Sequence, residues 1–241
     1  MSINRGDNMK IEIWSDFVCP FCYIGKARLE QAIERFPEDL SVEKEYKSFQ
    51  LDPQAGPYDG TSIHESLAAK YNMSVEKAKQ MNEQVAEQAK MVGLDFVFDT
   101  MKHGNTFDAH RLAKFAKEQG KEEEIVSRLL YHYFTLSIDI SDNDSLAQVA
   151  EEIGLDSKEI KAVLSDKDAY KQEVLEDQAR AQALGITGVP FFVFNGKYAI
   201  SGAQPVETFM QALERVAEEE NQGLEDLSSS GSYCDGDSCT R

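Results

Sequence analysis

The stretch FVCPFCYIG, residues 17–25, decides how the rest of the chain is interpreted. It follows residues 10–14, where isoleucines alternate with charged side chains at the two-residue period of a β-strand. It opens a segment whose apolar residues recur at helical spacing as far as Pro37. Cys19 and Cys22 therefore stand where a predicted strand passes into a predicted helix.

The two cysteines have the spacing of a redox pair. N–H groups at a helix start, together with the helix dipole, stabilise an anion, so we expect Cys19 to be the nucleophilic thiolate. Pro20 suits the first helical turn, where its missing N–H costs no hydrogen bond. Cys22 lies about one turn deeper and is the expected resolving thiol, which attacks the mixed disulfide formed by Cys19. The predicted chemistry is dithiol–disulfide exchange.

A metal site is the alternative use of these cysteines. Cys234 and Cys239 form a second close pair, and four cysteines in two pairs can bind zinc. However, the first pair opens a long apolar helix beside a βαβ pattern, which favours redox chemistry. Two inert buried cysteines would leave their place at a helix start unexplained. We therefore expect no metal and no cofactor beyond a redox-active disulfide.

The order of predicted elements indicates an α/β fold. Residues 41–49 alternate again as a strand and complete a βαβ unit. Residues 61–184 contain helix after helix and no convincing strand. Two short apolar runs in residues 191–200 flank Asn-Gly, a strong hairpin signal, and a last helix follows Pro205. This order predicts a mixed sheet with helices on both faces and a large all-helical insertion.

The dipeptide Val189-Pro190 immediately precedes the first hairpin strand. A proline at this place removes no ladder hydrogen bond. A cis bond would leave the Val189 backbone exposed, ready to pair with a substrate strand beside Cys19, whereas a trans proline would only start the strand. The sequence leaves both forms open.

Composition and charge limit the classes of molecule that we expect the protein to bind. The formal net charge is −18, with 43 acidic and 25 basic residues, which argues against nucleic-acid binding on electrostatic grounds. No apolar run approaches about 20 residues, so no membrane-spanning helix is expected. The first eight residues lack the apolar core of a signal peptide, and we expect a cytoplasmic protein.

At this point the sequence resembles the DsbA-like thioredoxin-fold oxidoreductases, and within them the FrnE-type branch. The resemblance rests on the strand–CPFC–helix unit, the large helical insertion, and the segment TGVPFFVFNGKYAISGAQ at residues 187–204. The segment NTFDAHRL, residues 105–112, resembles a signature of that branch. The similarity covers about residues 10–220.

The resemblance implies a thioredoxin fold interrupted by a helical domain, with the active site at their junction. It implies that Val189 and Pro190 form a cis-proline loop beside Cys19 and Cys22. Asn105, His110 and Arg111 would lie near the interdomain cleft with Pro20 and Phe21, although a helix cap and structural polar contacts are the simpler interpretation of the first three. The implied domain boundaries are an extension at 1–9, a thioredoxin-like domain at 10–60 and 185–221, an insertion at 61–184, and a flexible tail at 222–241.

One departure from the family pattern concerns the direction of electron flow. DsbA itself has a histidine before its second cysteine, whereas this chain has Phe21, which offers the thiolate neither charge nor a strong donor. We therefore expect a weaker oxidant than DsbA. Expected partners are protein or small-molecule disulfides and dithiols, with glutathione as a candidate co-substrate. The alternative activity is that of the glutathione-dependent transferases and isomerases of the same superfamily, which carry serine at the first motif position.

The tail pair completes the sequence-based picture. Gly236 lies between Cys234 and Cys239, so a local disulfide is geometrically easy. Some FrnE-type proteins carry such a second motif. A flexible tail would reach about 20 Å from the last helix. Exchange of electrons with Cys19 and Cys22 is one hypothesis, and an inert or metal-binding tail is the other.

Overall fold

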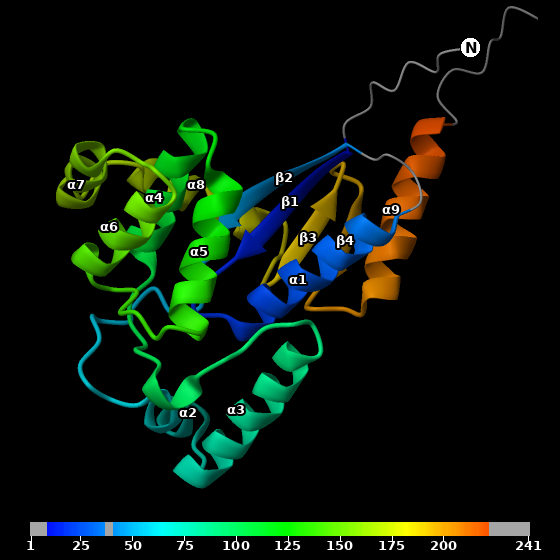
Figure 1. Cartoon of the computed structure of the whole chain (residues 1–241). Helices are drawn as coiled ribbons and strands as arrows, with labels where there is room; N and C mark the ends of the chain where they lie inside the picture. The colour runs from blue at the N-terminus through cyan, green and yellow to red at the C-terminus, as the bar shows by residue number, and fades with distance from the viewer. Residues whose placement is uncertain (1–8, 37–40, 222–241) are drawn as a thin grey trace, which may run out of the picture.

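One mixed sheet organises the part of the chain that the computed structural model describes, residues 9–36 and 41–221 (Figure 1). Its four strands lie in the order β2-β1-β3-β4. The central strand β1 (Met9–Ser15) pairs in parallel with β2 (Val42–Ser48) and antiparallel with β3 (Phe191–Phe194). The hairpin partner of β3 is β4 (Tyr198–Ser201). The predicted mixed sheet and hairpin are confirmed.

Helices cover both faces of this sheet. Helices α1 (Pro20–Arg35) and α9 (Val206–Asn221) pack together on one face, where the rings of Phe192 and Phe209 meet edge to face at 4.9 Å. Helix α8 (Lys171–Ala183) covers the other face. There the indole N–H of Trp14 donates to the Asp177 carbonyl at 3.1 Å. The alternation of β1 therefore buries side chains on both faces, as a sheet between two helical layers requires.

The insertion between β2 and β3 is helical, as the sequence predicts. Ser62 and Glu65 form a capping box at the first of its helices. Lys102 and Asp139 form an isolated bridge within it, outside the named strands. Its elements are α2 (Ile63–Tyr71), α3 (Val75–Lys90), the short 3₁₀ helix η1 (Phe98–Thr100), α4 (Phe107–Glu118), α5 (Glu122–Phe134), α6 (Asn143–Glu152), α7 (Ser157–Ser165) and α8.

The insertion contacts the sheet on two sides. Helix α5 packs against β2, and α8 lies across β2 on the far face.

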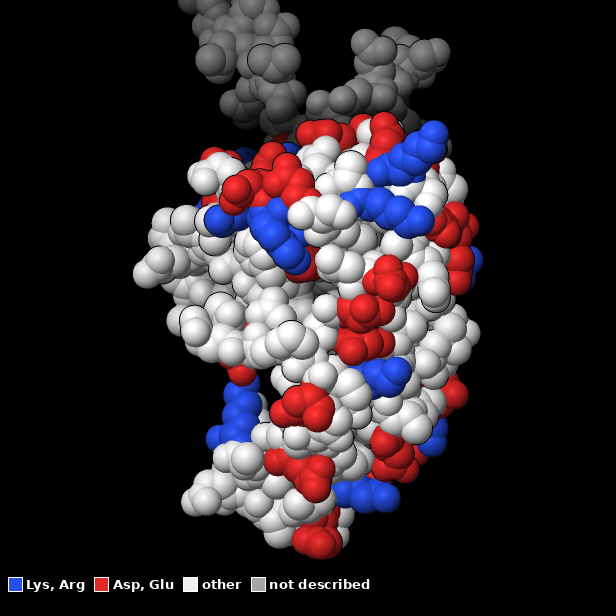
Figure 2. Space-filling model, turned by 90° about the vertical axis from the view of Figure 1, so that its left-hand side faces the viewer, with Lys and Arg blue, Asp and Glu red and all other residues white. Residues whose placement is uncertain are grey.

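In Figure 2, acidic and basic side chains are interspersed over one face, and a hollow separates the lower part, which contains α2 and α3, from the body above it. The sequence-derived domain boundaries stay a prediction. No helix within the described residues is long and apolar enough to span a membrane.

The topology brings several chain segments to one end of the sheet. Strands β1 and β4 run in the same direction, because each is antiparallel to β3. Helices α1 and α9 therefore both begin at the end where β1 finishes. The residues that follow β1, those that follow β2 and those that precede β3 meet there, while Asn221 lies at the opposite end (Figure 1).

Candidate active site

Cys19 occupies the N-cap position of α1. Its φ and ψ of −92° and 110° are extended, and Pro20 begins the helix, so the strand-to-helix position predicted from the sequence is confirmed. The Cys22 N–H donates to the Cys19 carbonyl at 3.0 Å, which closes the first turn and holds the two residues on one side of the helix start. Both cysteines are buried free thiols.

The proline loop faces the first cysteine. The Val189–Pro190 peptide bond is cis. The Cys19 thiol donates to the Val189 carbonyl at 3.5 Å, so residues about 170 positions apart in the chain meet at the sheet end. On the other side of the loop, the Gly202 N–H donates to the Pro190 carbonyl at 2.8 Å. The sequence left the cis and trans forms open, and the tertiary structure adopts the cis form.

Gly25 lets α1 approach this loop closely. A Cβ atom at this position would lie 3.1 Å from Pro190 Cγ and 3.1 Å from Phe192 Cζ. Such contacts are tighter than ordinary van der Waals packing, so a side chain here would push α1 away from the proline loop. The glycine therefore sets the distance between the helix that carries the cysteines and the loop that faces them.

The environment of the second cysteine disfavours its thiolate form. Burial, followed by the hydrogen bond and charge of Cys19, raises the pKa of the Cys22 thiol well above its usual value. The Ser15 side chain and the Asp16 backbone oppose this shift. A thiol that stays protonated until a mixed disulfide forms is suited to the resolving role.

Asp16 is a site residue that the sequence interpretation missed. Its side chain is 1% exposed, and its Oδ1 atom lies 3.2 Å from Nε2 of His110 on α4. Its Oδ2 atom accepts from the Leu51 N–H at 2.8 Å, and its carbonyl accepts from the Cys19 N–H at 3.2 Å. Asp16 thus joins the cysteine turn to the loop after β2 and to the insertion. An acid placed between a strand and a C-x-x-C was the available signal.

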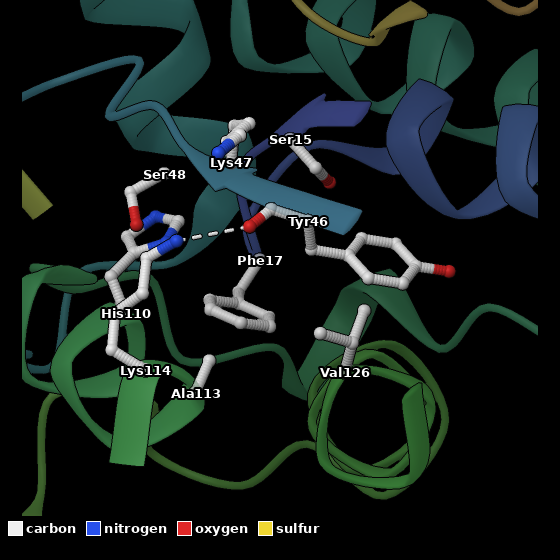
Figure 3. Close-up of a pocket in the computed structure, with 9 residues that line it drawn as sticks. All are labelled: Ser15, Phe17, Tyr46, Lys47, Ser48, His110, Ala113, Lys114 and Val126. Atoms are coloured by element: carbon white, nitrogen blue, oxygen red, sulfur yellow. Dashed lines mark hydrogen bonds between the residues drawn. The ribbon is translucent and has the colours of Figure 1, made fainter. Parts of the chain in front are cut away.

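The surroundings of His110 are shown in Figure 3. The ring of Phe17 lies in the centre of the view, with His110 and Ala113 of α4 on one side and Val126 of α5 on another. The centroids of the Phe17 and His110 rings are 4.8 Å apart. Lys114 follows one turn later on α4 and donates to the Tyr46 carbonyl of β2 at 3.0 Å. The predicted site residue His110 therefore lies beside the cysteine turn, packed against Phe17.

The other two residues of the branch signature make structural contacts. Asn105 accepts from the Phe107 N–H at 2.8 Å and so caps α4, and it also donates to the Ala55 carbonyl at 2.9 Å. Arg111 is fully buried, and its Nη1 donates to the carbonyls of Val163, Asp166 and Ala169. Arg111 therefore fastens the end of α7 to α4 and does not share contacts with the cysteine pair.

The surface beside the cysteines is apolar. Phe21, the residue between Pro20 and Cys22, is 40% exposed, whereas Cys19 itself is only 3% exposed. The ring of Tyr23 stacks on Phe96 of the loop after α3, at 5.8 Å between centroids, and so joins the helix start to the insertion. Phe21 is therefore the most exposed side chain of the motif, whereas Cys19 is almost completely covered.

The metal alternative requires cysteines that the structure does not describe. Cys234 and Cys239 both lie outside the described residues. Within residues 9–36 and 41–221, His, Cys, Asp and Glu side chains form no group of three or more that could hold a metal ion. The predictions about the tail pair therefore stay predictions.

Comparisons with known proteins identify a family for this chain. Residues 10–214 match the family described as the DSBA-like thioredoxin domain. The chain is 31% identical over 207 residues to YwbO, an uncharacterized protein of Bacillus subtilis, with 84% of this chain and 94% of that protein covered.

Solved structures show the same fold. A probable DsbA oxidoreductase from Streptomyces coelicolor is 42% identical, with a TM-score of 0.83 and with 88% of this chain and 91% of that chain covered. A 2-hydroxychromene-2-carboxylate isomerase is similar in fold, with a TM-score of 0.68 over 90% of this chain and 100% of that chain, at 15% identity. These matches do not single out the FrnE-type branch, which stays a prediction.

Proposed function

The chain belongs to the DSBA-like thioredoxin domain family, and on that premise we propose that it is a thiol–disulfide oxidoreductase with Cys19 and Cys22 as its redox pair. One observation carries the proposal. The Cys19 thiol, at the start of α1, faces the backbone of the cis Val189–Pro190 loop at 3.5 Å. A substrate strand that paired with this loop would present its disulfide to Cys19.

The proposed reaction has two steps. The Cys19 thiolate attacks one sulfur of a substrate disulfide, forming a mixed disulfide and releasing the other substrate sulfur as a thiol after it takes a proton. The Cys22 sulfur then loses its proton and attacks Cys19, which closes the protein disulfide and releases the second substrate thiol. Two electrons pass from the protein dithiol to the substrate, and the reverse sequence oxidises a dithiol.

Protein substrates and glutathione are the proposed partners. The exposed Phe21 ring offers an apolar contact to a polypeptide beside the active sulfur. Oxidised glutathione offers the same disulfide in a smaller molecule. The proposed compartment is the cytoplasm, where the dithiol would be kept reduced. Cell fractionation of the untagged protein tests the compartment separately from the activity.

The experiment is a disulfide-reduction assay with the full chain. Cys19→Ser is expected to abolish reduction of insulin and of oxidised glutathione, whereas Cys22→Ser is expected to trap a mixed disulfide with either substrate. Cys234→Ser/Cys239→Ser is the matched control for the first exchange step, because it removes two cysteines outside the motif. Full disulfide reduction by Cys19→Ser would refute the proposal. Glutathione-dependent turnover of an organic electrophile, without disulfide exchange, would favour the transferase or isomerase alternative.

The tail pair is proposed as an accessory electron carrier for the same reaction. Asn221 lies at the sheet end opposite Cys19, because the 16-residue helix α9 runs about 24 Å away from it. The expected tail reach of about 20 Å is comparable with that distance. Deletion of residues 228–241 is expected to slow repeated turnover and to leave the first exchange step unchanged. Unchanged repeated turnover would remove the accessory role.

A further inference from the structure

A cleft with a volume of about 220 Å³ lies between the loop after β2, helix α8 and the segment that leads into β3. None of the described residues that line it is charged, although the whole chain has 43 acidic and 25 basic residues. Its apolar part is formed by Phe49 and Ile186, and its polar part by Gln50, Gln178, Gln182 and Thr187.

The cleft begins close to the place where Cys19 meets the proline loop. Thr187, which lines the cleft, is two residues before Val189, whose carbonyl accepts from the Cys19 thiol at 3.5 Å. Two residues of chain span at most about 7 Å. A polypeptide joined to Cys19 and lying along this loop therefore reaches the cleft about two residues from its own cysteine.

The backbone between the cleft and Cys19 is free to pair with another chain. Within residues 9–36 and 41–221, the N–H groups of Thr187, Gly188 and Val189 donate to no backbone carbonyl. The pairing of β3 with β1 begins only at Phe191. Unpaired backbone groups at the edge of a sheet can hydrogen-bond to an added strand, and neighbouring pockets then select its side chains.

A chain of hydrogen bonds orients the amide groups of the cleft. Gln178 Nε2 donates to Gln50 Oε1 at 3.2 Å, and Gln50 Nε2 donates to Asn105 Oδ1 at 3.3 Å. Asn105 is itself fixed as the cap of α4. Gln178 Oε1 and the amide of Gln182 bond to no other described residue, so they are available to a ligand.

The size of the cleft and its lack of charge indicate one kind of occupant. Sites that enclose a whole small molecule usually have about 300 to 1,000 Å³, so this cleft suits a single side chain. Glutathione has two carboxylates and an ammonium group, for which the lining offers no opposite charge. Amides, by contrast, can both donate to and accept from a peptide backbone or an uncharged side chain.

Exposed apolar side chains adjoin the cleft in the sequence. Leu51 follows Gln50 and is 41% exposed, and Leu184 precedes Gly185 and is 54% exposed. Together with Phe21, they give this end of the sheet apolar surface that a polypeptide can cover. A small charged disulfide gains little from such surface.

We propose that the cleft lined by Gln50, Gln178, Gln182 and Thr187 is a subsite for polypeptide substrates, which takes an uncharged side chain about two residues from the substrate cysteine. The inference rests on the proposed function and deepens it by naming the preferred substrate class, an extended polypeptide rather than glutathione. Gln178 and Gln182 are the proposed binding residues, and Asn105 is a positioning residue that acts through Gln50.

The test uses the full chain with Cys22→Ser/Cys234→Ser/Cys239→Ser, in which Cys19 is the remaining cysteine. The probes are single-cysteine peptides joined by a disulfide to thionitrobenzoate. The Cys19 thiolate attacks the peptide sulfur, the peptide–thionitrobenzoate S–S bond breaks, and thionitrobenzoate leaves with the electron pair. Its absorbance gives the second-order rate constant of this step.

The length and charge of the peptide are the variables. Relative to the blocked single amino acid cysteine, we expect a four-residue uncharged extension on one side of the cysteine to raise the rate constant roughly tenfold. Glutamate or lysine two positions from the cysteine on that side should remove most of the gain, and the glutathione probe should show little gain. Equal rate constants for all peptides, or an equal gain for glutathione, would overturn the inference.

The variant Gln178→Ala/Gln182→Ala should lose most of the gain from the extension. The ratio of the rate constants for the long and short probes is compared, so that any change in the reactivity of Cys19 itself cancels. The matched control is Gln172→Ala, which changes the same kind of residue on α8 where the side chain bonds to the exposed Glu176. Its ratio should stay within twofold of the parent ratio. An equal fall in both variants would contradict the assignment of the cleft.

A further variant does not depend on the stability of the hydrogen-bonded chain. Gln182 is exposed and bonds to no described side chain, so Gln182→Lys should fold. It should raise the rate constant for the glutamate-bearing peptide roughly threefold and leave that of the lysine-bearing peptide no higher. No difference between these two peptides would refute the subsite.

Failure of the inference and failure of the proposed function give different results. If even the shortest probe releases no thionitrobenzoate above the level of a Cys19→Ser chain, the proposed function fails. If the shortest probe reacts but extension of the peptide brings no gain, the polypeptide subsite alone fails.

Discussion

Three buried acids on the sheet and Asp16, which follows β1, differ in the groups that bond to their carboxylates. The lysine-paired cluster consists of Glu12, Glu45 and Asp177 with their basic partners Lys10, Lys47, Lys114, Lys117 and Arg180. At the end of β1, Asp16 has an imidazole and a backbone amide instead. The first group fixes the insertion to the sheet. The second joins the turn before Cys19 to α4 and to the loop after β2, without a lysine or arginine partner among the described residues.

The comparison teaches that burial of a charge does not by itself indicate function. Asp177 bonds to Lys114 of α4 and accepts from the Ser48 N–H of β2 at 2.8 Å, so it ties three elements together. Removing one partner from such a network leaves another charge unpaired. Asp16 is connected to fewer groups, but those groups include the turn that carries Cys19. Variants at the two places should therefore change different measurable quantities.

The largest loss of stability is expected for Asp177→Ala. The change leaves Lys114 buried without its carboxylate and the Ser48 N–H without its acceptor, at a cost of about 4 kcal/mol in the free energy of unfolding. Urea denaturation measures this loss, and disulfide exchange per folded molecule should be unchanged. Asp168→Ala, which removes an exposed partner of Lys171 in the turn before α8, is the control and should cost less than about 0.5 kcal/mol. Similar losses in both would contradict the structural role of the cluster.

A smaller loss, with a different signature, is expected for His110→Ala. The variant removes the ring that bonds to Asp16 and packs on Phe17, and we expect a loss of about 2 to 3 kcal/mol. Disulfide exchange should also slow, because the turn before Cys19 loses one of its supports. His110→Gln should recover most of both quantities. If His110→Ala loses stability but keeps full activity per folded molecule, His110 has only a structural role, like the lysine-paired cluster.

The pH dependence of stability should come from the lysine-paired cluster through Glu45. Burial would raise the pKa of Glu45, but hydrogen bonds from Lys10, Lys117 and Lys47 outweigh burial and hold the pKa well below its usual value. A carboxyl whose pKa is lower in the folded state stabilises the protein above the unfolded pKa of about 4.3 and ceases to do so as the pH falls.

Glu45→Gln should therefore cost about 1 to 2 kcal/mol at pH 7, and its difference from the parent should shrink progressively below about pH 4. Urea denaturation across pH 3 to 8 measures the difference. If the difference in the free energy of unfolding between Glu45→Gln and the parent grows as the pH falls, the expected direction of the pH dependence is wrong. The exposed Glu87, which bonds to Lys90 on the solvent side of α3, provides the control variant Glu87→Gln.

The smallest effect is expected for Arg180→Ala at the rim of the cluster. Arg180 bonds to Glu12 at 2.7 Å and lies over the Trp14 ring at 5.7 Å, but its side chain is about half exposed. Solvent screening limits the expected loss to about 1 kcal/mol or less. Arg180→Lys, which keeps the charge, should recover part of it. A loss as large as that of Asp177→Ala would remove the distinction between the centre and the rim of the cluster.

The fold could be predicted from the sequence because local patterns specify the individual elements and the order of these elements specifies the sheet. The alternation in residues 10–14, the apolar period after Cys19, and Asn195-Gly196 each specify one local element. Helix starts were predictable where a side chain caps the backbone, as at Ser62. Before α4 the side chain that caps the backbone belongs to Asn105, two residues before Phe107.

The site was predictable only in its local part. The position of Cys19 and Cys22 follows from backbone geometry within a few residues, so the motif and its neighbours suffice to place it. Arg111 was harder to interpret, since its partners at the end of α7 are about 50 residues away in the chain. Asp16 was missed because its role depends on His110, which is 94 positions away.

By itself, the sequence determined a mixed α/β sheet, a helical insertion and a thiol pair at a helix start, because these features depend on short-range periodicity and backbone dipoles. The tertiary structure alone decided the cis form of Val189–Pro190, the contact between that loop and the Cys19 sulfur, and the neighbours of each buried charge. Such features depend on which distant segments meet at one end of the sheet. Burial then makes electrostatic interactions strong, and no local pattern records what a charge will face once it is removed from water.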